Sequence, residues 1–474
     1  MTTADYLYVH IPFCKTICYY CDFVHRVYQE DIVDAYLLSL QKEIESKEIS
    51  SLKTIYIGGG TPTSLNERQL DRLLSLFDSY VSEVKEYTIE INPETLTEEK
   101  IQILKKHGVN RVSIGLQTTE DKLLKLMNRH HTFSCVQSVV SLLKQYGITN
   151  ISLDIMYSLP FQTMESLKKS VNDALSLHPT HLSLYSLTIE ENTVFERKGY
   201  DHLDEDTEAD MYEWIVQKLN ASFYHQYEVS NFALEGYESQ HNQAYWRYED
   251  FYGCGAGASG KENHIRYEKS KDIRQYIQDP FQQEEIFLDK KDEMFENIMM
   301  SLRMKQGMNI HAFDERFQTS FIDVYGEKIK PLMQKNLVEI ENGYFRCSEI
   351  MAGGLKKSNI KKKSQRAELM AEEKRIEQEK EQAKKDAAIR KKKNYNKNAI
   401  DTMFPLYGLI GAVLSVLFNQ IGIFSLVALV LGFLGMKRNA DKKDKFYYIA
   451  IADIVVGLIT AVLFVLFITG VIHQ

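Results

Sequence analysis

Three closely spaced cysteines stand near the start of the chain, in the stretch VHIPFCKTICYYCDF at residues 9–23. Cys14, Cys18 and Cys21 are an odd set, whereas paired disulfides need an even number of cysteines. Thiolates are soft metal ligands, and three of them on one short loop can each hold one iron of a [4Fe–4S] cluster. The fourth iron is then free for a ligand that is not protein. The CxxxCxxC spacing therefore indicates an iron–sulfur site.

The other cysteines, Cys135, Cys254 and Cys347, stand singly, and a packed thiol is the favoured interpretation of each. The chain opens without the charged region, apolar segment and cleavage site of a secretory signal. We therefore expect residues 1–350 to be cytoplasmic, in a reducing compartment where thiols are available as metal ligands.

Short runs rich in β-branched and aromatic residues alternate with helical patterns along residues 1–235. The runs are DYLYVH, KTIYIGGG, EYTIEI, RVSIGLQ, NISLDIMY and HLSLYSL, and the helix candidates lie at 30–48, 66–80, 97–107, 133–146 and 163–177. Strands that alternate with helices predict βαβ units and a parallel sheet. Six such units in a row predict an α/β fold with a TIM-like (β/α)6 barrel or partial barrel.

The residues that could do chemistry stand where these strands end. The cysteine loop follows the first strand, GGGTPT at 58–63 follows the second, Glu90 ends the third and Gln117 the fourth. Active sites of such barrels lie at the carboxyl ends of the strands, so we expect these residues on one rim. Each also has a plainer interpretation: a tight turn for the glycines, a solvated carboxylate for Glu90, a helix-end cation for Arg129 and a cap for Asp154.

The motif HIPFCKTICYYCDF, together with IGGGTPT, resembles the radical S-adenosylmethionine (AdoMet) proteins. More narrowly, the chain is similar to the oxygen-independent coproporphyrinogen III oxidase group and its haem chaperone branch of HemW type. Further matching stretches are SIGLQT, RHHT, LDIMYSLP, SLYSLTIEENT, YEVSNFA and HNQAYW, and they reach to about residue 350.

The resemblance implies that Cys14, Cys18 and Cys21 ligate the cluster, whose open iron chelates AdoMet. A reduced cluster then passes one electron to the sulfonium, which leaves a 5′-deoxyadenosyl radical that the protein positions and shields. The family pattern places Tyr20 beside the cluster. It implies an AdoMet site lined by Tyr8, Gly59, Gly60, Thr61, Glu90, Gln117, Arg129 and Asp154.

Two departures distinguish this chain from the oxidase group, which resembles CxxxCxxCxC after a longer amino-terminal extension. Phe23 stands where the further cysteine would be, and only 13 residues precede Cys14. Both departures favour the haem chaperone branch, as does HNQAYW at 241–246, since that branch carries HNxxYW and is thought to bind haem with it. The resemblance implies that His241 is an axial haem ligand; a structural histidine beside buried aromatic residues is the alternative.

The composition changes abruptly after residue 350. Residues 1–350 carry 36 Lys and Arg against 54 Asp and Glu, a net charge of −18, whereas residues 351–474 carry 21 against 11, a net charge of +10. Residues 351–402 are crowded with charge and poor in large apolar side chains, which is typical of a basic linker. The haem chaperone family has no counterpart of it, so an evolved fusion and a joined pair of reading frames are both open.

Residues 403–474 predict a membrane module of α-helices. Residues 403–436 contain no charge, yet a helix of that length would be about 51 Å long, against roughly 30 Å for a hydrocarbon core. We therefore expect a hairpin there, flanked by basic clusters at 391–397 and 437–445 that favour the cytoplasm. With a further span at 446–470, three crossings are expected, and two are the alternative.

The sequence thus predicts four segments. They are a radical AdoMet barrel with its cluster and AdoMet site at 1–235, a shortened α/β domain with the HNxxYW motif at 236–350, the basic linker at 351–402 and the transmembrane module at 403–474.

The function implied by the resemblance is a chaperone that binds haem and delivers it to membrane haemoproteins. The chain would be anchored in the lipid bilayer of the cytoplasmic membrane, and we expect no nucleic-acid partner. One alternative is a coproporphyrinogen III oxidase-like enzyme of porphyrin biosynthesis, although the motif departures make that activity the less favoured one. Another is that the membrane module is the biologically important part and the rest is appended.

Overall fold

The computed structural model describes residues 4–348, which belong to one compact unit, Met1–Lys356. The predicted linker at 351–402 and the predicted transmembrane module at 403–474 lie outside the described residues. Within the part that is described, no helix combines the length and the apolar composition needed to cross a bilayer.

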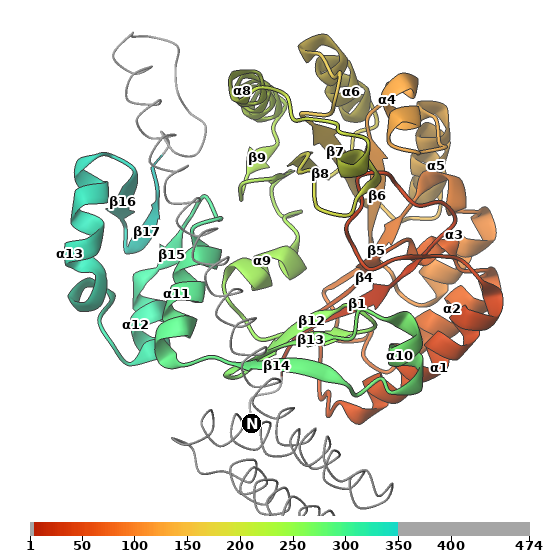
Figure 1. Cartoon of the computed structure of the whole chain (residues 1–474), viewed down its shortest axis with the longest axis horizontal. Coiled ribbons are helices and arrows are strands. Elements are labelled where there is room, and N and C mark those ends of the chain that lie inside the picture. Colours follow the sequence, from red (N-terminus) through yellow and green to blue (C-terminus); the bar gives the residue numbers. More distant parts are fainter. Residues whose placement is uncertain (1–3, 349–474) are drawn as a thin grey trace, which may run out of the picture. The chain divides into compact units, whose positions relative to one another are not determined.

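The largest sheet has nine strands in the order β11-β1-β4-β5-β6-β7-β8-β10-β9 (Figure 1). The predicted strand pattern is confirmed, because each of the six expected runs forms one of the neighbouring parallel strands of this sheet. These strands are β1 (Tyr6–Ile11), β4 (Thr54–Gly59), β5 (Glu86–Ile91), β6 (Arg111–Gln117), β7 (Asn150–Tyr157) and β8 (His181–Ser186).

Short strands lie at both edges of the sheet. β11 (Tyr252–Cys254) pairs parallel with β1, and β10 (Asn231–Ala233) pairs antiparallel with β8 and with β9 (His225–Gln226). Among the described residues β9 and β11 do not pair with each other, so the sheet is an open, partial barrel. β11 lies beyond residue 235 and extends the sheet next to the strand that precedes the cysteine loop.

The central strands alternate apolar and polar side chains. In β5, Tyr87, Ile89 and Ile91 belong to the main hydrophobic core, whereas Thr88 and Glu90 are the residues between them. This period of two puts the apolar side chains toward the covering helices and the polar ones toward the inside of the barrel. The inside of the barrel is therefore polar, as a site for a charged ligand requires.

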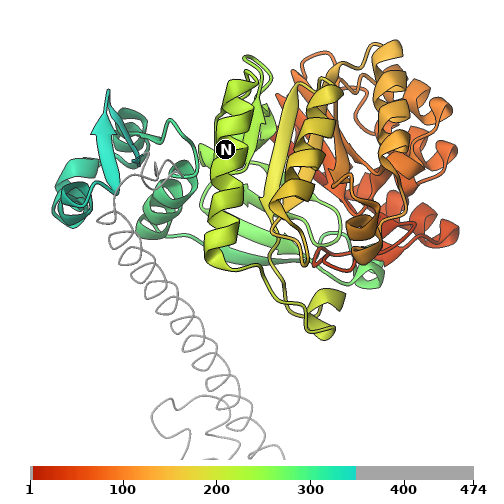
Figure 2. The same ribbon diagram turned by 90° about the horizontal axis from the view of Figure 1, so that it is seen from above.

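The longer helices that connect the strands lie along one face of the sheet (Figure 2). They are α1 (Glu30–Ser46), α2 (Glu67–Ser75), α3 (Glu98–Lys106), α5 (Phe133–Gln145), α6 (Met164–Ser176) and α8 (Glu205–Ala221). The short helices α4 (Asp121–Leu126) and α7 (Val194–Arg197) contribute to a small apolar cluster with Tyr19 and Tyr20 of the cysteine loop. All five predicted helices are confirmed, although α2 ends at Ser75 and not at residue 80 as predicted.

Local sequence explains where several of these helices begin and end. Six of them start at a side-chain oxygen that accepts a backbone N–H three residues on, as N-caps do; the caps are Asn66, Thr97, Thr132, Thr163, Thr193 and Asp204. Gly108 and Gly147 follow α3 and α5 with φ of +77° and +79°, a left-handed conformation that glycine adopts without strain.

The rest of the described chain forms smaller layers. A three-stranded antiparallel sheet contains β12 (Ser259–Glu262), β13 (Ile265–Lys269) and β14 (Gln283–Phe287). The helix α9 (Gln240–Trp246) precedes this sheet in sequence, and α10 (Ile273–Gln278) connects β13 to β14. A separate core around Phe313, Phe321 and Phe345 is built from α11 (Lys290–Ser301), α12 (Ile310–Phe317), α13 (Phe321–Gln334), β15 (Met308–Asn309), β16 (Val338–Glu341) and β17 (Tyr344–Cys347).

Candidate functional site

The cysteine loop leaves the carboxyl end of β1 and is closed at its base by the backbone. Its two short strands, β2 (Phe13–Cys14) and β3 (Arg26–Val27), pair in parallel. The N–H of Arg26 donates to the carbonyl of Pro12 at 2.7 Å, and the N–H of Tyr28 donates to the carbonyl of Cys14 at 2.9 Å. The segment between these strands therefore forms a defined loop, which carries Cys18 and Cys21, and Cys14 stands at its start as the last residue of β2.

The side chains around the loop fit an anionic iron–sulfur cluster. Cys14, Cys18 and Cys21 are free thiols. Nη1 of Arg129 lies 3.6 Å from Sγ of Cys18, and the hydroxyl of Thr61 donates to Sγ of Cys14 at 3.7 Å. A guanidinium and a hydroxyl group at these distances stabilise the thiolate forms that ligate metals.

The protein ligands of an iron–sulfur cluster are arranged differently from those of a single metal ion. Within residues 4–348, no three His, Cys, Asp or Glu side chains converge on a single metal ion. A [4Fe–4S] cube takes one cysteine per iron, so its three protein ligands do not need to converge in that way. Burial raises the pKa of the Cys14 thiol to about 11 and that of Cys21 to about 12, so cluster binding must release protons from them.

The glycine turn after β4 brings the backbone close to the cysteine loop. The N–H of Gly60 donates to the carbonyl of Ile11 at 2.9 Å. A Cβ atom built on Gly60 would lie 3.0 Å from Sγ of Cys14, and one built on Gly59, whose φ is +111°, would lie 2.6 Å from the ring of His10. Both positions therefore require glycine, because a side chain would displace the walls of the site.

Glu90 lies under this turn and is held by two donors. The hydroxyl of Tyr56 donates to Oε1 at 2.8 Å and the N–H of Gly59 to Oε2 at 3.1 Å. The Glu90 side chain is partly exposed, yet it lies deep inside the barrel. Burial there raises its pKa to about 7, and the nearby Asp154 carboxylate adds to this shift. Glu90 can therefore change its charge near neutral pH and can accept a hydrogen bond from a bound ligand.

Three further predicted residues lie at the neighbouring strands. Gln117 ends β6 in the left-handed region, with φ of 62°. The hydroxyl of Ser113 lies 3.0 Å from both carboxylate oxygens of Asp154, and burial raises the pKa of Asp154. The hydroxyl of Tyr8 lies 2.9 Å from Nδ1 of His10. These groups continue the polar lining from Glu90 across β6 and β7 and back to β1.

Tyr20 lies on the cysteine loop itself. Its ring is 6.4 Å from that of Phe195 in α7, so an apolar contact holds this part of the loop against the barrel. Sequence reasoning missed Asn92, whose amide oxygen accepts from Arg129 at 2.9 Å while its Nδ2 donates to Thr61 at 3.1 Å. Its place directly after the third strand was the signal that could have identified it.

His241 lies apart from this rim, at the amino-terminal ends of the strands. Its Nδ1 is 2.6 Å from the hydroxyl of Thr54, the first residue of β4, and its Nε2 is 2.8 Å from the hydroxyl of Tyr245. Its side chain is 1% exposed, and burial lowers its pKa to about 3. The imidazole is therefore neutral, and both its nitrogens have hydrogen-bond partners.

The start of α9, which carries HNQAYW, is bound by Glu86, the first residue of β5. This carboxylate accepts from the hydroxyl of Ser239 at 3.1 Å and from the N–H groups of Gln240 and His241 at 2.8 and 3.1 Å. Two predicted groups of residues thus fall at opposite ends of the barrel. The cysteine, glycine and acidic residues gather at the carboxyl ends of the strands, and the HNQAYW helix lies at the other end.

Fold and rim together define the class of protein. Parallel strands with a CxxxCxxC loop after the first and a glycine turn after the second are the arrangement of a radical AdoMet protein. Residues 8–174 match the family model of the Radical SAM superfamily, and residues 288–349 match that of the HemN C-terminal domain. The fold is similar to coproporphyrinogen III oxidase (HemN) from Escherichia coli, with a TM-score of 0.65 and 23% identity over 74% of this chain and 88% of that one.

Relatives of higher identity define the family. The chain is 43% identical over 340 residues to the heme chaperone HemW of Lactococcus lactis subsp. lactis, covering 70% of this chain and 90% of that protein. It is 40% identical over 347 residues to the heme chaperone HemW of Bacillus subtilis, covering 70% of this chain and 92% of that protein. This chain belongs to the HemW family of heme chaperones.

Proposed function

We propose that this chain is a haem chaperone, which holds a [4Fe–4S] cluster, AdoMet and haem. The observation that carries the proposal is the similarity of this chain to a heme chaperone over 90% of that protein's length. In addition, Phe23 stands where the oxidase group has a further cysteine. Phe23 is exposed and its carbonyl accepts from His25, so this position adds no thiol to the loop. The other candidate function, an oxidase acting on coproporphyrinogen, is kept as an outcome of the test.

We propose that Cys14, Cys18 and Cys21 ligate the cluster, which when bound supplies the electron that cleaves AdoMet. The remaining residues have positioning roles. Arg129, anchored on Asn92 and the carbonyl of Gly115, supplies a fixed positive charge beside Cys18. Thr61 binds Cys14 and connects the loop to the glycine turn.

The AdoMet site would occupy the polar rim above these ligands. Glycine at 59 and 60 lets a ligand approach the backbone, and Glu90 accepts from a hydroxyl or ammonium group of AdoMet. Tyr20 would lie beside the cluster. The remaining lining residues in this proposal are Tyr8, Gln117 and Asp154.

As an axial haem ligand, His241 would have to give up one of its two hydrogen bonds and become accessible. In the proposal its ring fixes α9 to the barrel, and axial ligation is an outcome to be tested. We propose segment boundaries at residues 235, 350 and 402. Anchoring of the chain in the cytoplasmic membrane through residues 403–474 would bring it to its acceptors, the membrane haemoproteins.

The test is a pair of assays on the full-length chain, with the cluster reconstituted without oxygen. Haem-loaded protein should transfer haem to an apo-haemoprotein, followed by the absorption spectrum of the acceptor. The same preparation, given AdoMet and a reductant, should not convert coproporphyrinogen III to protoporphyrinogen. Multiple turnovers of that conversion would overturn the chaperone function in favour of the enzyme. Haem that stays with the chain in the presence of the acceptor would contradict delivery.

A further inference from the structure

A glycine-rich segment beyond residue 235 lies against the cysteine loop. β11 pairs in parallel with β1, so the carboxyl ends of the two strands lie on the same rim. The sequence YGCGAGASG at 252–260 contains β11 and residues 255–258, which directly follow it and which we call the wall loop. The wall loop lies outside both regions that match the family models, 8–174 and 288–349.

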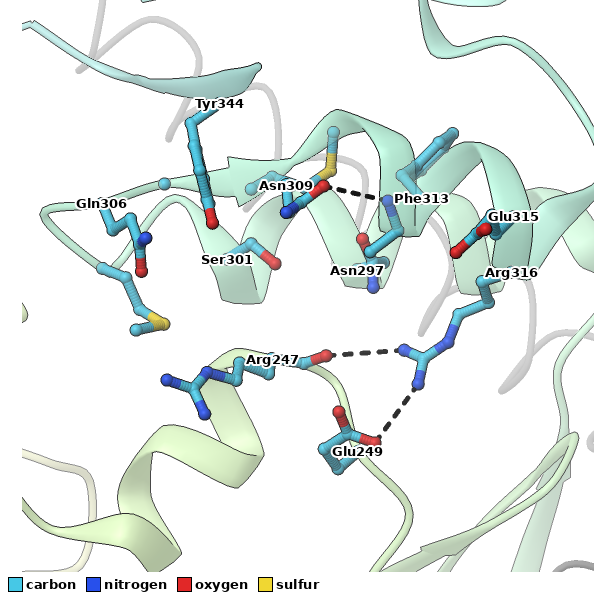
Figure 3. Close-up of a pocket in the computed structure, with 14 residues that line it drawn as sticks. Arg247, Glu249, Asn297, Ser301, Gln306, Asn309, Phe313, Glu315, Arg316 and Tyr344 are labelled. Carbon is cyan, nitrogen blue, oxygen red and sulfur yellow. Dashed lines mark hydrogen bonds and ion pairs between the residues drawn. The ribbon is translucent and has the colours of Figure 1, made fainter. Parts of the chain in front are cut away.

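A pocket of about 700 Å³ lies elsewhere beyond residue 235, where the segment after α9 meets α11, α12 and β17 (Figure 3). Arg316 there donates to the carbonyl of Arg247 and to the carboxylate of Glu249, each at 3.5 Å. The described residues that line this pocket include none of the cysteine rim. The contact with the rim is therefore made by the wall loop and not by the pocket.

Two glycines of the wall loop leave no room for a side chain. Gly257 has φ of +78°, and a Cβ atom built on it would lie 2.5 Å from Cγ2 of Val24, which stands three residues after Cys21. Gly255 has φ of +99°, and its Cβ atom would lie 2.4 Å from the carbonyl oxygen of His10. The backbone of the wall loop thus packs directly against the second half of the cysteine loop and against β1.

Tyr36 of α1 binds the wall loop to the strand that precedes the cysteine loop. Its buried hydroxyl accepts from the N–H of Ala256 at 2.9 Å and donates to the carbonyl of His10 at 2.8 Å. The imidazole of His10 lies 2.9 Å from the carbonyl of Val24 through Nε2 and 2.9 Å from the hydroxyl of Tyr8 through Nδ1. His10 therefore connects the wall loop to the cysteine loop and to the polar rim.

Glu43, further along α1, fixes the wall loop through a second bond. Glu43 is 1% exposed, and its Oε2 accepts from the N–H of Gly255 at 2.9 Å and from the hydroxyl of Tyr276 at 2.6 Å. Its Oε1 lies 2.7 Å from Nζ of Lys269, whose side chain is 3% exposed. A buried ion pair holds its partners in place, because breaking it leaves an uncompensated charge in the core. The wall loop is therefore firmly attached to α1.

We propose that the wall loop positions the cysteine loop for AdoMet binding, an inference that rests on the proposed cluster and AdoMet site. Because Val24 follows Cys21 by three residues, the wall loop limits where this part of the loop and its cysteine can lie. A displaced cysteine moves the open iron relative to the residues that hold AdoMet, and a misplacement of about 1 Å can cost 10²-fold in rate. Tyr36, Glu43 and Gly257 are thus positioning residues, which act through Val24 and His10.

The experiment compares Gly257→Ala with Gly343→Ala in the full-length chain. Both glycines have a positive φ, +78° and +81°, but a Cβ atom on Gly343 meets nothing within 4 Å. The measurement is the electron paramagnetic resonance spectrum of the reduced cluster, titrated with AdoMet. Gly257→Ala should keep the cluster and raise the AdoMet Kd about tenfold, as the loss of one charge-assisted contact does. Gly343→Ala should match the unmodified chain.

Further variants separate positioning from a general loss of stability. Val24→Ala added to Gly257→Ala should restore part of the AdoMet affinity, because it removes the Cγ2 atom at 2.5 Å and leaves the Cβ atom at 2.8 Å. Tyr36→Phe should also raise the AdoMet Kd, and it carries the test if Gly257→Ala does not fold. Its control is Tyr224→Phe, which removes a buried hydroxyl bonded to the carbonyl of Pro179 and should leave the Kd unchanged. Thermal unfolding shows which variants are folded.

The outcomes distinguish this inference from the proposed function. If the unmodified chain takes up no cluster, or its spectrum does not respond to AdoMet, the proposed function fails. If it responds, and Gly257→Ala and Tyr36→Phe bind AdoMet as their controls do, the wall loop has no positioning role and the function stands. A weakened affinity that Val24→Ala does not restore would assign the effect to general destabilisation, and would also overturn the inference.

Discussion

Tyr56 donates its hydroxyl to Oε1 of Glu90 at 2.8 Å. The ring of the same tyrosine stacks on His241, with centroids 5.2 Å apart and planes inclined by 28°. Glu90 belongs to the rim that we assign to AdoMet, and His241 belongs to the HNQAYW helix. A single side chain in the barrel, that of Tyr56, therefore contacts both functional regions. It connects Glu90 to the helix that carries HNQAYW.

Replacement of Glu90 should change how stability depends on pH. Its pKa is raised from 4.5 to about 7 in the folded chain. The favourable contribution of protonated Glu90 to the free energy of unfolding is therefore fully present below pH 4.5. The contribution is lost as pH rises through 7, because only the unfolded chain ionises freely in between. Glu90→Gln should remove this decline, which amounts to about 3 kcal/mol at most and to less for a partly exposed group. Urea unfolding from pH 5 to 8 measures it.

The control for this prediction is Glu48→Gln, an exposed carboxylate near the end of α1. Its pH profile should follow that of the unmodified chain. Parallel profiles for Glu90→Gln and the unmodified chain would contradict the assignment of the titration to Glu90.

Burial of neutral His241 should make the folded chain less stable as pH falls below 6.5. Its pKa is lowered from 6.5 to about 3, so the folded chain keeps it neutral while the unfolded chain binds a proton below pH 6.5. The unfolded state therefore gains protons, and stability falls as pH falls, by about 2 kcal/mol between pH 6.5 and 5. His241→Gln should lower the free energy of unfolding at pH 7 but reduce this acid loss. An unchanged acid slope in the variant would show that His241 is not buried as described.

Cys21→Ala should abolish the cluster, because it removes one of three thiolate ligands. After reconstitution without oxygen, iron and sulfide should each be about four per chain in the unmodified protein, as the cube requires. Cys135→Ala, which lies in α5 and away from the loop, should keep that content. Equal loss of iron from both variants would rule out the loop as the cluster site.

Gly59→Ala should destabilise the chain more than Gly236→Ala. Both glycines have a positive φ, +111° and +84°, so alanine adds backbone strain of about 1–2 kcal/mol at either position. A Cβ at Gly236 meets nothing within 4 Å, whereas one at Gly59 lies 2.6 Å from the His10 ring. The difference between the two free energies of unfolding reports the clash with His10 together with the greater backbone strain at the larger φ. Equal values would mean that the turn above Glu90 can shift enough to accommodate the methyl group of alanine.

The proposed membrane topology can be tested by thiol labelling of the full-length chain in cells. In a background without other cysteines, Lys397→Cys and Asp441→Cys should label from the cytoplasm and Gln420→Cys from the far side, because basic clusters favour the cytoplasm. Cytoplasmic labelling at 420 would exclude a full hairpin and leave a segment that enters and leaves on one side.

Local sequence predicted the elements that position the cysteine rim. Runs such as EYTIEI and NISLDIMY contain β-branched and aromatic residues at a period that only strands satisfy, and Asn or Thr caps mark the helices between them. The position of the site residues on one rim could also be predicted, because the carboxyl ends of parallel strands lie on the same side of a sheet. The contacts of Cys18 with Arg129 and of Cys14 with Thr61 agree with this placement.

Other contacts could not be predicted because they join distant parts of the chain. Glu86 and the start of α9 are more than 150 residues apart, and no periodicity in HNQAYW indicates a carboxylate partner. The three residues of β11 are too few to show a strand pattern. The pocket near Arg247 is likewise assembled from separate segments, each with an ordinary sequence.

The HNQAYW helix contacts Thr54 and Glu86 at the start of their strands, whereas the cysteine loop follows the end of β1. A strand of six residues, such as β4, spans about 20 Å. An enzyme that attacks a porphyrin with a carbon radical must bring the two into bonding contact, but a carrier must return its cargo chemically unaltered. A porphyrin bound beside this helix would therefore be separated by the length of the strands from a radical formed beside the cysteine loop. A change of function from porphyrin synthesis to haem transport would then require a different binding position for the porphyrin and no change of fold.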